Sequence, residues 1–186
     1  MSDVETPKSG GFNWLLLIPL VIALGLGTMA ALSFQISPED RSSLPSAFEG
    51  RPAPALDLPP LNPMAEGPTT ADLSKPGIKM VNFWASWCAP CRVEHPVLKE
   101  IARAGTPIIG VNYKDSAENA QSFLDELGDP FASVGTDENG RTAINWGLYG
   151  VPETFVIDGE GNVLLRHAGP ITRSIYEQRF APLLNP

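Results

Sequence analysis

The chain has 186 residues, of which 13 are Lys or Arg and 21 are Asp or Glu, so its formal net charge is −8. The basic residues are scattered along the chain, which gives no support to nucleic-acid binding, and the acidic excess most simply favours solubility. The length suits one domain of ordinary size with additional segments.

The first predicted element is an apolar segment near the N-terminus. Residues 9–38 contain no charged side chain, and residues 14–32 form a nearly unbroken apolar run. As a helix this run would measure roughly 28 Å, close to the thickness of a bilayer core. We therefore predict a transmembrane anchor at 14–32, preceded by a short cytoplasmic tail at 1–13. A cleaved signal peptide is the alternative, because small residues among 28–31 resemble a cleavage site.

A linker and one folded domain are predicted after the anchor. Residues 33–54 contain four prolines with several serines and charged residues, a composition typical of a partly extended tether. The domain is predicted at 55–186. A short, nearly neutral tail is easily left in the cytoplasm, which would place the linker and the domain outside it. An oxidising compartment would also explain why the chain has only two cysteines.

The domain is predicted to alternate strands and helices. Two short edge strands are expected at its start, at 56–58 and near Leu73. Continuous apolar runs predict buried strands, and amphipathic stretches predict helices. The further predicted strands are 78–85, 106–111, 153–158 and 163–167, and the predicted helices are 91–104, 117–127, 141–146 and 172–184. This order favours an α/β fold with a central mixed sheet flanked by helices.

The two cysteines, Cys88 and Cys91, lie at a predicted strand-to-helix junction. Such a Cys-x-x-Cys pair is typical of a dithiol that works by thiol–disulfide exchange. A helix N-terminus favours an anion, so we expect Cys88 to be the attacking thiolate and the less exposed Cys91 to be the resolving thiol. A structural disulfide is the first alternative, although closing so short a loop would constrain the unfolded chain little. A zinc site is the second, but the only histidines, His95 and His167, complete no common ligand spacing.

Several stretches of the domain resemble known proteins. Residues 83–91 (Phe-Trp-Ala-Ser-Trp-Cys-Ala-Pro-Cys) resemble the active-site stretch of the thioredoxin fold, and residues 150–155 resemble its second signature, a cis-proline before a strand. The sequence is most similar to the membrane-anchored thioredoxin-like proteins of cytochrome c maturation, the CcmG or DsbE family. The stretches that carry this closer resemblance are 91–95, 110–115 and 146–155.

The resemblance implies roles for residues around the dithiol. We expect a cis bond between Val151 and Pro152, which would turn the Val151 backbone toward the dithiol, where it can pair with a substrate strand. Trp87 is expected to line the substrate groove together with these two residues and Glu153. No metal and no cofactor is expected.

One position departs from ordinary thioredoxins, which carry a buried aspartate where this chain has Asn82. An amide cannot take the proton of the resolving thiol. Glu94 lies three residues after Cys91 on the same helix and is our first candidate for the base, and Glu153 is the second. Partial burial would raise the pKa of either carboxyl toward the working range of a base. Without a catalytic role, both would be ordinary surface residues.

The resemblance further implies a reductant in the bacterial periplasm, held by the inner membrane. Its expected partners are apocytochrome c, whose haem-site cysteines it would reduce, or other cytochrome c maturation proteins, with a membrane electron donor of the DsbD type. Three alternatives stay open: a general reductase of the TlpA or ResA type, a periplasmic disulfide donor, and a tethered copper chaperone using Cys88, Cys91 and His95.

Overall fold

A computed structural model describes residues 18–34 and 48–184, and the chain divides into two units, 1–41 and 42–186. In the first unit, helix α1 (Ile18–Phe34) covers most of the predicted anchor. The rest of that prediction, residues 14–17, lies outside the described residues, as do the predicted tail and residues 35–47 of the predicted linker. Among the described residues, no helix has both the length and the apolar character needed to span a bilayer.

The second unit is built on a five-stranded mixed sheet with the order β3-β2-β1-β4-β5. Its strands are β1 (Lys79–Trp84), β2 (Ile108–Tyr113), β3 (Ser133–Asp137), β4 (Glu153–Ile157) and β5 (Val163–Ala168). Strand β1 is central, pairing in parallel with β2 and antiparallel with β4. All six of its residues are buried, as the continuous apolar run predicted. The predicted α/β fold with a central mixed sheet is confirmed.

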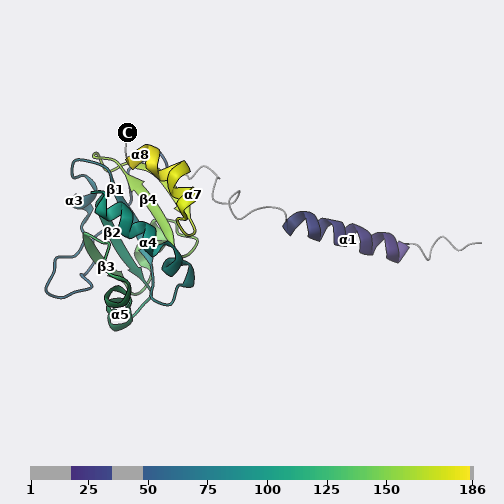
Figure 1. The fold of residues 1–186 in the computed structure, drawn as a ribbon, viewed down its shortest axis with the longest axis horizontal. Coiled ribbons are helices and arrows are strands. Elements are labelled where there is room, and N and C mark those ends of the chain that lie inside the picture. The colour runs from purple at the N-terminus through teal and green to yellow at the C-terminus, as the bar shows by residue number, and fades with distance from the viewer. Residues whose placement is uncertain (1–17, 35–47, 185–186) are drawn as a thin grey trace, which may run out of the picture. The chain divides into compact units, whose positions relative to one another are not determined.

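Helices cover both faces of this sheet (Figure 1). They are α3 (Thr70–Leu73), α4 (Ala89–Arg103), α5 (Ala117–Leu127), α6 (Arg141–Asn145), and a C-terminal series of α7 (Arg173–Ile175), the π-helix η2 (Tyr176–Phe180) and α8 (Ala181–Leu184). Side chains of α4, α5 and η2 pack on one face, and those of α3 and α6 pack on the other. The sheet therefore carries a separate core on each side.

The alternation of side chains along β1 decides what meets the dithiol. Val81 and Phe83 enter the core shared with α3 and α6. Met80 and Trp84 point to the opposite face, where Trp84 packs in one cluster with Cys88 and Cys91. Because side chains alternate along a strand, Asn82 lies on this same face, beneath α4.

Three features near the sheet differ from the sequence predictions. Residues 49–53, which the sequence prediction places in the linker, bond to β5 and to the turn before it. Gly50 N donates to Val163 O at 2.8 Å, and Ala53 N donates to Gly161 O at 2.8 Å. The predicted edge strands are wrong: 56–58 forms no strand, and the segment ending at Leu73 is the short helix α3. Strand β3 was not predicted.

Candidate active site

The dithiol lies where β1 gives way to α4. Cys88 is the N-cap residue of α4, with an extended backbone (φ −87°, ψ 102°), and Pro90 occupies the first turn, where its missing N–H costs little. The Cys88 sulfur accepts a hydrogen bond from Cys91 N at 3.2 Å. This is the position in which unpaired helix N–H groups stabilise a thiolate, so the local structure supports Cys88 as the nucleophile.

The two cysteines are joined by a disulfide, which is the oxidised state of an exchange protein. Both residues are buried, with 3% of Cys88 and 2% of Cys91 exposed. The expected difference in exposure is therefore slight in this state. What distinguishes the two sulfurs is the N–H group that Cys88 faces.

The segment before β4 lies against the dithiol cluster. The bond between Val151 and Pro152 is cis, as predicted, and Pro152 is buried. Val151 is partly buried and packs against the cluster that contains both cysteines. Trp87 and Tyr149 are largely exposed, at 58% and 85%. Trp87 directly precedes Cys88, so its exposed ring offers aromatic surface beside the disulfide that is suited to hold an apolar part of a substrate.

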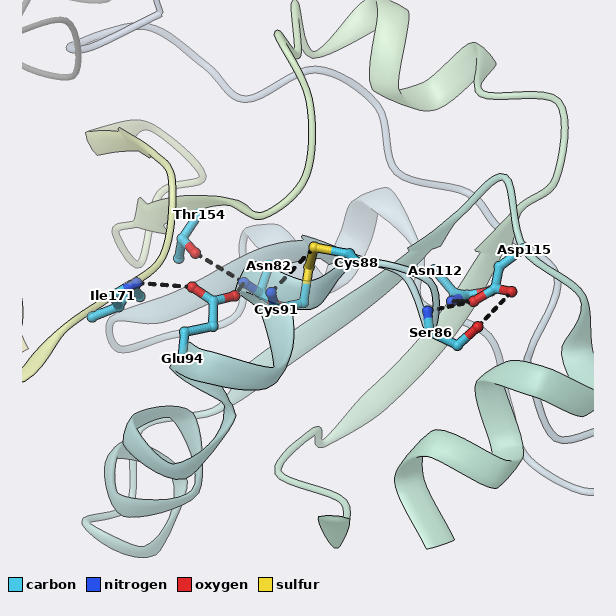
Figure 2. Close-up of a disulfide and its surroundings, with 9 residues drawn as sticks. All are labelled: Asn82, Ser86, Cys88, Cys91, Glu94, Asn112, Asp115, Thr154 and Ile171. Carbon is cyan, nitrogen blue, oxygen red and sulfur yellow. Dashed lines mark hydrogen bonds between the residues drawn. A yellow bond between two sulfur atoms is a disulfide. The ribbon is translucent and has the colours of Figure 1, made fainter. Parts of the chain in front are cut away.

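Glu94 is fully buried on the same side of α4 as Cys91 (Figure 2). Its Oε1 accepts from Asn82 Nδ2 at 2.9 Å, and its Oε2 accepts from the backbone N–H of Ile171 at 2.9 Å. Burial raises the pKa of Glu94 to about 7, although both hydrogen bonds act in the opposite direction. A carboxyl with this pKa can both take up and release a proton near neutral pH.

Glu153 is also fully buried, but it is occupied differently. Its Oε1 forms an ion pair with Arg166 Nε, and its Oε2 accepts from Tyr149 N at 3.1 Å. Burial raises the pKa of Glu153, while Arg166 acts in the opposite direction. Arg166 also bonds Gly147 O and lies 4.5 Å from the ring centroid of Tyr149. The pair therefore holds the segment before the cis-proline, and this geometry favours Glu94 over Glu153 as the base.

The comparisons with known proteins agree with this geometry. A family model described as Redoxin matches residues 48–179. The chain is 46% identical over 171 residues to the thiol:disulfide interchange protein HelX of Rhodobacter capsulatus, an alignment covering 91% of this chain and 95% of that protein. It is 45% identical over 173 residues to the DsbE homolog of Paracoccus denitrificans, covering 93% and 94%.

The chain belongs to the DsbE family of thiol:disulfide interchange proteins. Its fold resembles the crystal structure of a thiol:disulfide interchange protein of the thioredoxin family from Chlorobium tepidum, with a TM-score of 0.58, 25% identity and coverage of 76% of this chain and 99% of that one. The predicted family and the predicted thiol–disulfide oxidoreductase activity are confirmed.

The alternative that Glu94 and Glu153 are ordinary surface residues is wrong, because each is fully buried. Arg166 was not predicted as the partner of Glu153. Asp115, which is hydrogen-bonded to Ser86 just before the dithiol, was not predicted either. Asp115 lies within the stretch 110–115 that carried the family resemblance, and this was its only signal.

Both histidines of the domain are buried and contact neighbouring elements of the fold. His95 is 3% exposed and its Nε2 lies 2.7 Å from Gly128 O, so it links α4 to the end of α5. His167 is buried on β5 with Nδ1 3.1 Å from Arg179. Within residues 18–34 and 48–184, no three His, Cys, Asp or Glu side chains are grouped as a metal site requires.

Proposed function

We propose that this DsbE-family protein is a reductant of cytochrome c maturation, acting on the haem-site cysteines of apocytochrome c or on a partner disulfide of the same route. Its relatives HelX, CycY and DsbE are thiol:disulfide interchange proteins, and the resemblance to the CcmG or DsbE family implies a role in cytochrome c maturation. The observation that carries the proposal is the Cys88–Cys91 pair at the start of α4, beside a buried carboxyl with a pKa of about 7.

Reduction would proceed in two exchanges. The Cys88 thiolate attacks one sulfur of the substrate disulfide, forming a mixed disulfide and releasing the other sulfur as a thiolate, which takes a proton from water. Cys91 then gives its proton to Glu94, and its thiolate attacks the Cys88 sulfur. The second substrate sulfur leaves and is protonated. Two electrons have then moved to the substrate, and the protein is left with the Cys88–Cys91 disulfide.

The substrate would bind as an extended peptide beside the dithiol. The Val151 backbone, in the segment that Glu153 and Arg166 brace, would pair with the substrate backbone. The exposed ring of Trp87, next to Cys88, would contact a side chain near the substrate cysteines. A membrane electron donor of the DsbD type would restore the dithiol.

We further propose that the chain is a single-pass protein of the bacterial inner membrane with this domain in the periplasm. The uncharged stretch 9–38 and the presence of only two cysteines support this location. Anchoring would raise the effective concentration of the dithiol near a membrane-bound assembly system.

Trapping the mixed disulfide tests this function. The Cys91→Ser variant can attack a substrate but cannot release it, so partners should stay attached to Cys88 and be identified by mass spectrometry. The matched control is the variant with both cysteines changed to serine, which should trap nothing. Recovery of c-type apocytochromes or of cytochrome c maturation proteins is expected. Recovery of unrelated exported proteins alone would favour a general reductase and refute the proposal.

A further inference from the structure

One carboxylate ties the loop after β2 to the turn that leads into the dithiol. Asp115 Oδ2 accepts from Ser86 N at 2.6 Å, and Asp115 Oδ1 accepts from Ser86 Oγ at 2.9 Å. The same group accepts from Asn112 Nδ2 at 3.1 Å and from Ser116 N at 2.9 Å. Figure 2 shows Ser86, Asn112 and Asp115 together on one side of the disulfide. Asp115 thus joins the end of β2, the start of α5 and the turn before Cys88.

The loop after β2 also has an unfavourable backbone conformation at the residue that contacts this turn. Lys114 has a φ of 46°, and no other non-glycine residue in the described part of the chain has a positive φ. Such a conformation persists where the surroundings hold it. Here Lys114 N donates to Asp137 O at 3.1 Å, and Lys114 O accepts from Trp87 Nε1 at 3.1 Å. Ser86 and Trp87 are therefore both fixed by consecutive residues of one loop.

The turn matters because it sets the position of the nucleophile. Cys88 N donates to Ala85 O at 3.2 Å, so Ser86 and Trp87 are the two central residues of the turn that ends at Cys88. Cys88 then caps α4 and its sulfur faces Cys91 N. If this turn loosened, the sulfur could leave the helix N-terminus and lose the N–H groups that stabilise its anion.

We propose that Asp115 is a positioning residue of thiol–disulfide exchange, whose carboxylate fixes the Ser86–Trp87 turn and thereby keeps the Cys88 sulfur at the N-terminus of α4. Asp115 acts through Ser86. The role belongs to the exchange reaction itself and does not depend on which protein supplies the disulfide, so it stands or falls separately from the proposal on cytochrome c maturation.

The test compares Asp115→Asn with Ser86→Ala in the full-length protein. An amide nitrogen cannot accept a hydrogen bond, so Asp115→Asn loses some of the hydrogen bonds that hold the turn as well as the negative charge of the carboxylate. Ser86→Ala loses only the hydrogen bond from the Ser86 hydroxyl and keeps that charge. The pKa of Cys88 is measured in the reduced protein from the pH dependence of its alkylation by iodoacetamide. Loss of positioning raises this pKa, whereas loss of a nearby negative charge alone lowers it.

We expect the pKa of Cys88 to rise by about 0.5 unit in Asp115→Asn, which leaves about threefold less thiolate at a pH below the pKa. A smaller rise is expected in Ser86→Ala. The rate of reduction of a small aromatic disulfide should fall in the same order. This substrate has no peptide strand to dock, so the effect would come from the nucleophile.

Asp158→Asn is the matched control, because Asp158 also accepts several hydrogen bonds, from Glu160 N and from Asn162 N and Nδ2, in the turn between β4 and β5. It should lose stability and leave the pKa of Cys88 unchanged. A lower pKa in Asp115→Asn, an unchanged pKa in Ser86→Ala, or an equal rise in the control would overturn the proposal. If Asp115→Asn does not fold, Ser86→Ala alone decides the outcome.

Discussion

The buried carboxyl of Glu94 predicts a specific pH dependence for the second exchange. With a pKa of about 7, Glu94 loses its ability to accept a proton as the pH falls below 7, so the rate of resolution by Cys91 should fall about tenfold per pH unit there. In Glu94→Gln this inflection should disappear. A thiol with an ordinary pKa of about 8.5 is only about 3% thiolate at pH 7, so the variant should resolve up to roughly 30-fold more slowly.

The Glu94 carboxyl also predicts that the folding stability of the wild type and of Glu94→Gln depends differently on pH. The pKa of Glu94 in the folded protein lies above the ordinary carboxyl value of 4.5, so its contribution to stability is fully present below pH 4.5 and is lost as the pH rises through 7. The shift corresponds to about 3 kcal/mol of unfolding free energy lost between these limits. Glu94→Gln, which keeps an acceptor for Asn82, should lack this loss.

The assay separates the two exchanges. A mixed disulfide between Cys88 and a chromophoric thiol is prepared, and release of the thiol is followed by stopped flow from pH 5 to 9, with urea unfolding measured over the same range. Glu100→Gln is the control, because Glu100 lies on the same helix, is half-exposed and pairs with Arg173. An unchanged pH profile and an unchanged stability difference in Glu94→Gln would refute the argument.

Three further predictions concern the surroundings and the dithiol couple. Asn82→Asp would place a second carboxyl beside Glu94, so the inflection in the resolution rate should move to higher pH, and an unmoved inflection would contradict the contact at 2.9 Å. Arg166→Met would leave Glu153 buried without its ion-pair partner and should cost about 3–5 kcal/mol in urea unfolding, whereas Arg92→Met, at an exposed pair, should cost less than about 1 kcal/mol. Glutathione equilibration should give a reduction potential below about −180 mV, and a value near −120 mV, typical of an oxidant, would contradict the reductant assignment.

The regular parts of the fold were predictable because their patterns are local. Helix α5 has the predicted bounds, and the apolar runs mark β1 and β2 to within two residues. Strand β3 was missed because it is a short, half-buried edge strand of polar and small residues. Its Gly135 lies so close to Leu58 that a Cβ there would stand 2.6 Å from the Leu58 Cβ. Such a contact cannot be read from either segment alone.

Two parts of the site were predictable: the residues that are close in sequence, and the distant Val151 and Pro152, which the family resemblance supplied. Cys88, Cys91 and Glu94 share one helix, so their proximity follows from the helical repeat. The burial of Glu94 depends on Ile171, which lies 77 residues away. The bonds of Asp115 to Ser86 likewise span 29 residues, so tertiary structure was needed to find them.

The hydrogen bond from Ile171 N to Glu94 links the C-terminal part of the chain to the surroundings of the dithiol. Ile171 stands between β5 and α7, so displacement of the terminal helices would disturb the hydrogen bond that Glu94 accepts from its backbone. Tags, fusions or trimmed ends that disturb this join would alter the acidity of Glu94 while leaving both cysteines untouched. Fusions of this domain should therefore leave the C-terminal helices α7, η2 and α8 undisturbed.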